Sequence, residues 1–271
     1  MKNSALARFL RPAIFLAITA IAAASQTTIG LAPAMVMEDF KPGQPFEMDF
    51  NIANGTSIPM QMHGSTSDWW YNQKNDKIFS PASAAPYSAA NWMEVVPRTF
   101  VVPANGTFRF KVIVTPPATV TPGGHYAAVF IESKPEQSQA ATQEHKAVFT
   151  NIRMGALVLL TAEQTEKYDV VVSDPGLTPP SGSRNLKAEI LLENKSNTHI
   201  FPQVQLVIMN DKEEVVAKAQ GETKRFLPKQ KDHISVSWDG TLPAGSYSAI
   251  LTLIYGDGKV HAQDFKFRVP S

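Results

Sequence analysis

The sequence contains no cysteine among its 271 residues. That absence excludes disulfides, thiol nucleophiles and thiolate-bound metals, so stability has to come from ordinary hydrophobic cores. Neither positive nor negative charge is in clear excess. The formal net charge is only +1 and no basic stripe is present, so we expect no nucleic-acid partner.

Catalytic signatures are missing as well. The chain has no G-x-S-x-G elbow, no phosphate-binding glycine loop and no H-E-x-x-H motif. No two of its six histidines sit at metal-ligand spacing with a nearby carboxylate; they are His63, His125, His145, His199, His233 and His261. We therefore expect no enzyme, no metal site and no cofactor.

The first 25 residues have the layout of a signal peptide. Three basic residues precede a short apolar run at 13–23, and small residues at 22–25 supply a cleavage site. The run is too short to span a bilayer, and no later segment reaches that length. Cleavage would remove three basic groups and no acidic one, taking the formal net charge from +1 to −2. This predicts a periplasmic or otherwise extracytoplasmic protein without a membrane span; an uncleaved anchor is the alternative.

Alternation of apolar and polar residues dominates the remaining chain. A half-buried antiparallel strand requires this pattern because successive side chains point to opposite faces. It predicts strands at 46–52, 108–112, 234–238 and 265–269. Nearly continuous apolar runs predict strands covered on both faces, at 126–131, 156–160 and 247–255.

Turn signals rich in glycine, asparagine and proline separate these runs, and no long amphipathic helix is visible. Many short strands with regular turns favour β-sandwiches. We predict an all-β fold of two immunoglobulin-like β-sandwich domains in tandem, an N-terminal one at 27–162 and a C-terminal one at 166–271. The polar stretch 161–167 joins them.

Two long loops and one aromatic cluster are candidates for function. The loops are 71–91, rich in serine, alanine and proline, and 133–146, polar and rich in glutamine. Loops of this length are functional, mobile or tolerated insertions. The cluster Trp69, Trp70 and Tyr71 allows two interpretations: an aromatic platform for a sugar ring, or a core tryptophan beside edge aromatics.

Residues 91–133 carry a family resemblance. They contain PRTFVVP, then FRFKV, then TPGGHYAAVF; earlier comes FEMDFNIANGT, and later ENKSNTHIFPQV and LPAGSYSAILTLIYGDG. This series resembles the periplasmic pilus-assembly (fimbrial) chaperones and their wider set of chaperone-like relatives, of which the chain would be a divergent member with two Ig-like domains.

The resemblance implies binding by strand addition. In that family the last strand of the first domain is donated to a partner that lacks one, through main-chain hydrogen bonds and alternate apolar side chains. Here the equivalent segment is 147–156, with Val148, Ile152 and Met154 on one face and Arg153 on the other. The alternative is that Val148, Ile152 and Met154 face the core of their own sandwich.

The resemblance also implies two basic residues that hold the carboxylate of the partner between the domains. The sequence departs from it at both: Gln26 to Phe40 contains no Arg or Lys, and Gly155 stands where the lysine would be. We expect a non-enzymatic chaperone-like protein that binds a secreted or envelope polypeptide through its first domain. The alternative is a cell-envelope or cell-wall interaction module that binds protein or glycan. The sequence makes no prediction of oligomeric state.

Overall fold

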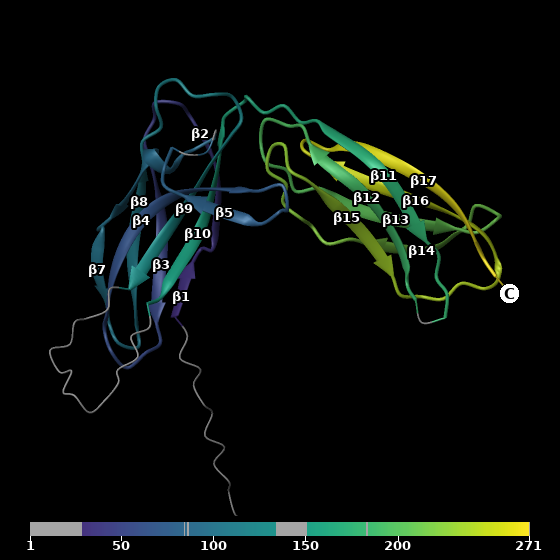
Figure 1. Ribbon diagram of the computed structural model, residues 1–271, viewed down its shortest axis with the longest axis horizontal. Helices are drawn as coiled ribbons and strands as arrows, with labels where there is room; N and C mark the ends of the chain where they lie inside the picture. Colours follow the sequence, from purple (N-terminus) through teal and green to yellow (C-terminus); the bar gives the residue numbers. More distant parts are fainter. Residues whose placement is uncertain (1–28, 84, 86, 134–150, 183, 271) are drawn as a thin grey trace, which may run out of the picture.

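The computed structural model describes residues 29–83, 85, 87–133, 151–182 and 184–270. In this part of the chain the structure consists of strands and one short 3-10 helix, Ala90–Trp92, and the strands build two β-sandwiches in tandem (Figure 1). The predicted all-β fold of two Ig-like sandwiches is confirmed. The predicted signal peptide, 1–25, lies outside the described residues.

The first sandwich packs two sheets face to face. One sheet has the order β1-β3-β8-β6, and the other has the order β2-β10-β9-β4-β5 with β7 also pairing β4. The strands of the first sheet are β1 (Ile29–Ala32), β3 (Phe46–Asn54), β8 (Gly106–Val114) and β6 (Met93–Val96). Those of the second are β2 (Met35–Phe40), β10 (Arg153–Ala162), β9 (Gly124–Ser133), β4 (Met60–Tyr71), β5 (Lys77–Ser80) and β7 (Thr99–Val102).

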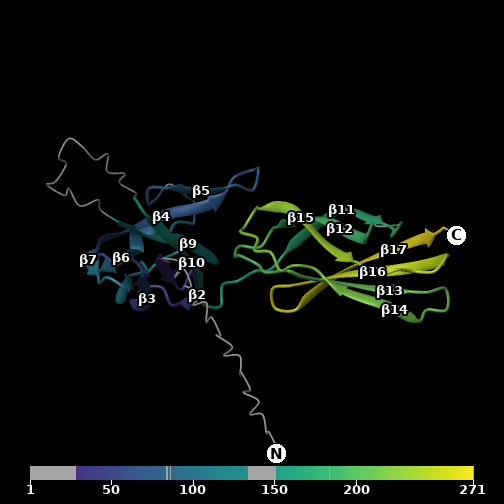
Figure 2. The same ribbon diagram turned by 90° about the horizontal axis from the view of Figure 1, so that it is seen from below.

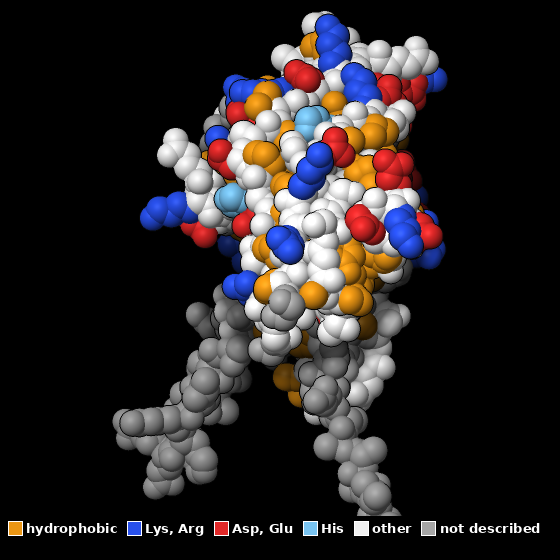
Figure 3. Space-filling model, turned by 90° about the vertical axis from the view of Figure 1, so that its right-hand side faces the viewer, with side chains coloured by type: hydrophobic (Ala, Val, Ile, Leu, Met, Phe, Trp, Pro, Cys, Tyr) orange, Lys and Arg blue, Asp and Glu red, His pale blue; other side chains and the backbone are white. Residues whose placement is uncertain are grey.

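The second sandwich has the same two-layer plan. Its sheets have the orders β11-β12-β15 and β14-β13-β16-β17. The strands are β11 (Val170–Thr178), β12 (Leu186–Asn194), β15 (Lys231–Trp238), β14 (Val215–Gln220), β13 (Gln203–Met209), β16 (Gly245–Tyr255) and β17 (Lys259–Val269). Its C-terminal end points away from the first domain. On the far face shown in Figure 3, acidic and basic side chains are interspersed.

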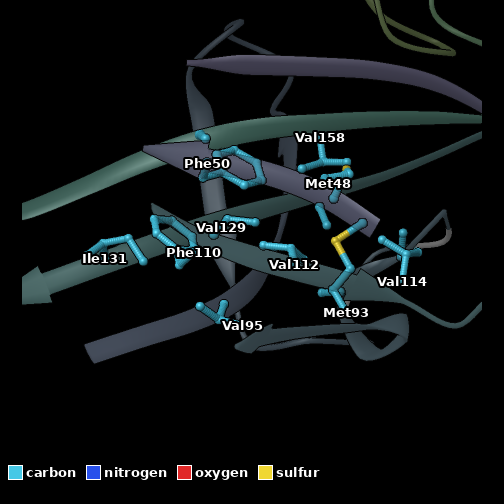
Figure 4. Close-up of a cluster of buried hydrophobic side chains, with 14 of the residues drawn as sticks. Met48, Phe50, Met93, Val95, Phe110, Val112, Val114, Val129, Ile131 and Val158 are labelled. Carbon is cyan, nitrogen blue, oxygen red and sulfur yellow. The ribbon is translucent and has the colours of Figure 1, made fainter. Parts of the chain in front are cut away.

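Sequence alternation creates the core of the first domain. Every second residue of β3 from Met48 to Asn54 is buried while its neighbours are exposed. Phe50 stacks on Phe110 of β8 with ring centroids 5.5 Å apart, and Figure 4 shows Val112 and Val129 in the same cluster. Each such buried side chain contributes about 1.5–3 kcal/mol to stability.

The apolar runs behave in two ways. As predicted for a doubly covered strand, β9 is buried on both faces: Val129 and Ile131 face the sandwich core, and Tyr126 and Phe130 face the other side. In contrast, β16 alternates buried and half-buried residues, because only one of its faces lies against the core. The predicted loop 71–91 also contains a strand, β5, which forms a hairpin with the end of β4.

Contacts between the two domains involve the outer face of the six-stranded sheet. A separate apolar cluster joins Trp69, Tyr126 and Leu159 of the first domain to Leu227 and Phe201 of the second. The β4–β5 hairpin extends toward the second domain in both ribbon views (Figures 1 and 2). At its tip the amide Nδ2 of Asn75 donates to the main-chain oxygen of Lys231 at 3.0 Å.

Candidate strand-addition edge and interdomain cleft

The β10 strand has two differently paired halves. From Leu157 to Ala162 it pairs with β9 on one side and runs parallel to β2 on the other. From Arg153 to Ala156 it pairs with β9 only, because the β2 pairing begins at Leu157. Among the described residues, the first half of β10 is therefore an open edge of the sheet.

The hydrogen-bond alternation shows which main-chain groups point outward. The Ser133 N–H donates to the Ile152 carbonyl at 2.8 Å, so Met154 and Ala156 also bond toward β9. Arg153 and Gly155 then direct their N–H and C=O groups to the other side. The Leu157 N–H continues this series and donates to Ala34 O at 3.0 Å. The main-chain groups of Arg153 and Gly155 have no strand partner among the described residues.

The apolar face predicted for donation lies partly against the core of its own domain. Met154 is half-buried and packs on the first core, and Ala156 beyond it is fully buried. Ile152 is half-buried just before the strand begins. Val148 and most of the loop 133–146 lie outside the described residues. Met154 therefore packs against the core of its own sandwich, which is the alternative to donation given above.

The opposite face of β10 carries an arginine that is held in place. The Arg153 guanidinium lies 3.8 Å from the centroid of the Phe130 ring, and its Nε is 2.6 Å from a carboxylate oxygen of Glu132. Phe130 also meets Phe79 edge-to-face at 5.0 Å. Gly155 is required here, because a Cβ at this position would lie 2.7 Å from the Phe130 ring.

The aromatic cluster predicted at Trp69, Trp70 and Tyr71 is divided by the structure. Trp69 is 1% exposed and belongs to the cluster between the domains, so it is no surface platform. Its indole packs edge-to-face against Tyr71 at 5.8 Å and Tyr126 at 6.1 Å. Trp70 and Tyr71 are half-buried, and with Trp69 they line a cavity of about 440 Å³.

An unpredicted cation lies in the cleft between the domains. The guanidinium of Arg225 sits 4.9 Å from the Trp69 ring, donates to the Tyr71 hydroxyl at 3.1 Å and contacts the Met35 sulfur at 2.9 Å. Its Nε is buried without a partner, and no carboxylate pairs with it among the described residues. A half-buried cation without an acidic partner favours binding of an anion.

Arg225 also affects a neighbouring histidine. His199 packs its ring against Tyr126 and Phe201, 5.8 Å from each. Burial, and secondarily the positive charge of Arg225, lower the pKa of His199 to about 4. His199 is therefore neutral at pH 7. Nothing in the local sequence around Arg225 or His199 indicates this contact, because it forms only when the two domains pack.

Within the described ranges, no group of three or more His, Asp or Glu side chains is arranged to hold a metal ion. No described helix is long and apolar enough to cross a membrane. The residues gathered at the β10 edge and in the cleft offer main-chain pairing, aromatic faces and positive charge, which are features of binding.

No protein-family model matches the chain, and no curated protein matches it in sequence. Similar solved structures include the class 5 fimbriae chaperone CfaA, with 14% identity, 90% of this chain and 100% of that chain covered, and a TM-score of 0.47. A chain of the Salmonella enterica SafA pilin–SafB chaperone complex has 12% identity, coverage of 91% and 99%, and a TM-score of 0.46. The E. coli chaperone DraB has 12% identity, coverage of 90% and 98%, and a TM-score of 0.45. The predicted resemblance to fimbrial chaperones is confirmed as a likeness of fold.

Proposed function

We propose that this chain is a non-enzymatic, periplasmic chaperone-like protein that binds a secreted or envelope polypeptide by strand addition to its first domain. The binding segment is the open half of β10 together with the residues that precede it, among them Val148 and Ile152. The division into domains at 27–162 and 166–271, after a cleaved signal peptide at 1–25, is part of the same proposal.

The observation that supports strand addition most strongly is the free main-chain edge at Arg153 and Gly155. Two outward N–H and two outward C=O groups are spaced as an added strand requires. An unprotected edge of this kind invites pairing with another chain.

The unpaired guanidinium of Arg225 supports a second point of attachment. The resemblance implies basic residues between the domains that hold a carboxylate of the partner. The segment from Gln26 to Phe40 of this chain contains no Arg or Lys that could do so. Arg225 places its charge in the same cleft from the second domain, next to Tyr71 and Trp69. We assign it to a carboxylate of the bound polypeptide, since a charge-assisted contact is stronger than a neutral one.

A proline at position 153 tests strand addition. Proline removes the outward N–H, and it is tolerated at a sheet edge where that N–H faces away from the neighbouring strand. The Arg153→Ala variant is the matched control, because it loses the same side chain and keeps the donor. Polypeptides captured from an envelope extract would be identified by mass spectrometry, and affinity would then be measured with the purified partner.

We expect Arg153→Ala to bind within about threefold of the unchanged protein and Arg153→Pro to bind at least about tenfold more weakly, as loss of one main-chain hydrogen bond predicts. Circular dichroism and thermal unfolding must show both variants folded. In the complex, amide exchange at Gly155 should slow. Equal binding by a folded Arg153→Pro variant, with no change in exchange at Gly155, would rule out this edge.

A further inference from the structure

The cavity beside Trp70 opens where two strands of the six-stranded sheet diverge. β4 pairs with β9 up to Ser67 and Ala128, and the pairing stops there. Beyond that point the chain around Tyr87 takes the place of β4: Tyr87 O accepts from the Tyr126 N–H at 2.7 Å, and Tyr126 O accepts from the Ala89 N–H at 3.0 Å. The end of β4 is thereby separated from β9, and the cavity of about 440 Å³ fills the gap.

Aromatic side chains form the walls of this cavity. Trp70, Tyr71 and Tyr87 are half-buried around it, and Leu227 of the second domain closes one side. A volume of this size, at a domain interface and lined by aromatic rings with a few polar groups, is typical of a small-ligand site. The cavity suits one or two rings of a ligand better than an extended chain.

Unpartnered hydrogen-bonding groups occur at the same place. The indole Nε1 of Trp69 is fully buried and has no partner in the described part of the chain. The Asn72 N–H donates to Asp76 O at 3.0 Å, so the alternation directs the main-chain groups of Trp69 and Tyr71 away from β5 and toward the gap. Trp69 is itself only 1% exposed, so of these groups the main-chain groups of half-buried Tyr71 are the ones that hydroxyls of a ligand in the cavity can reach.

The charge of the lining is one-sided. Lys229 and Lys231 of the second domain line the cavity, and no acidic side chain from the described part of the chain does. Neither lysine forms an ion pair with a described carboxylate. Gln73 adds a carboxamide to the lining, whereas those of Asn72 and Gln230 already bond Asp76 and Asn75. This pattern fits a ligand with an apolar ring face, hydroxyl groups and a negative charge.

We propose that this cavity binds an acidic saccharide, a pyranose that carries a carboxylate. Its ring contacts residues among Trp70, Tyr71 and Tyr87, its hydroxyls bond the outward main-chain groups of Tyr71 and the carboxamide of Gln73, and its carboxylate lies near Lys229 and Lys231. An aromatic side chain of a peptide would fill the walls but would leave these donors unsatisfied. The saccharide site is separate from the β10 edge and does not depend on strand addition.

Indole NMR provides a direct test. The chain has four tryptophans, so a ¹⁵N-indole spectrum shows four side-chain signals, which single Trp→Phe variants assign. The probe is a galacturonic acid trisaccharide, and its methyl ester is the neutral counterpart. We expect the acid to shift the Trp69 signal and leave that of Trp238 unchanged, and the ester to bind at least about tenfold more weakly.

Substitutions test which residues bind the carboxylate of the sugar. Lys229→Gln together with Lys231→Gln should weaken binding of the acid about tenfold, whereas Lys266→Gln on β17, outside the cavity, should not change it. Trp70→Ala should abolish the response; Tyr87→Ala serves the same purpose if the former fails to fold. Arg153→Pro should bind the sugar normally, which separates this site from the proposed function.

Three results would overturn the assignment. They are an unshifted Trp69 signal at millimolar trisaccharide, equal binding of acid and ester, and a Trp69 shift caused by an acidic aromatic tripeptide but not by the sugar. The last result would make the cavity a peptide site.

Discussion

At the residue scale, Arg225 brings positive charge into a cleft walled by aromatic rings. Its contacts with Tyr71, Met35 and the Trp69 ring fix the guanidinium without neutralising it. Arginine suits such a position, because its planar group stacks on aromatic rings while its N–H groups remain available to bond a carboxylate.

Replacing Arg225 by methionine keeps an unbranched apolar stem, although a shorter one, and removes the charge. We expect Arg225→Met to weaken capture of a carboxylate-bearing polypeptide about tenfold or more, because the anion loses its charged donor. The pKa of His199 should rise, since the repulsion from Arg225 disappears, and should stay below its usual value because burial remains. An NMR titration of His199 and a binding isotherm measure the two effects.

The control is Arg109→Met, which removes an exposed charge from β8, on the four-stranded sheet of the first domain. It should change neither quantity. If Arg225→Met folds and binds as well as Arg109→Met, the carboxylate is held elsewhere.

At the element scale, the strands with clear alternation were predictable and their pairing was not. Alternation in the sequence located β3, β8, β15 and β17, because burial of one face imposes a period of two. The point where β10 loses its second neighbour depends on where β2 joins it, which involves residues more than 100 positions apart. The gap between β4 and β9 depends on a loop replacing a strand. Local pattern carries no information about either event.

Two hairpins have the same type of turn, but only one of these turns contacts the other domain. In both, an asparagine side chain accepts from main-chain N–H groups two and four residues later: Asn72 in the β4–β5 turn and Asn210 in the β13–β14 turn. Asn75 and Glu213 occupy the equivalent left-handed position, with φ of 61° and 63°. Of the two, Asn75 contacts the other domain, bonding Lys231 O at 3.0 Å and Gln230 Nε2 at 3.2 Å.

Asn75→Gly therefore tests the hairpin as a tie between domains. Glycine tolerates the left-handed conformation, so the turn should persist while two interdomain hydrogen bonds are lost. At about 1 kcal/mol each, or about 2 kcal/mol together, we expect amide exchange in residues 227–231 to accelerate roughly thirtyfold. Glu213→Gly, the matched change in the other hairpin, should leave that exchange unchanged. Equal rates in both variants would mean that the apolar cluster alone holds the contact.

At the scale of the whole molecule, the two sandwiches meet through a contact that combines apolar packing with hydrogen bonds. The apolar cluster around Trp69 and Leu227 excludes water from the centre, and His199 lies beside it against Tyr126 and Phe201. Because the proposed carboxylate site and the proposed saccharide site both border this contact, its integrity should affect both. A change of pH that acts on His199 is a way to perturb it without mutation.

Acid should loosen the contact between the domains. The pKa of His199 is about 4 in the folded protein, below the 6.5 expected after unfolding, so the unfolded state binds more protons between these values. Stability contributed by neutral His199 is then complete above pH 6.5 and is lost as the pH falls toward 4, by roughly 3 kcal/mol. Protonation would place a second positive charge beside Arg225 in an apolar setting.

His199→Gln removes this titration and should flatten the pH dependence of unfolding between pH 6.5 and 4, measured by urea denaturation at several pH values. Burial also lowers the pKa of His125, which lies in the first domain, so a smaller dependence should remain. His125→Gln separates the two, because it should remove that remainder and leave the exchange of residues 227–231 as sensitive to acid as before. If His199→Gln keeps the full acid sensitivity, the pH-dependent group lies outside the domain contact.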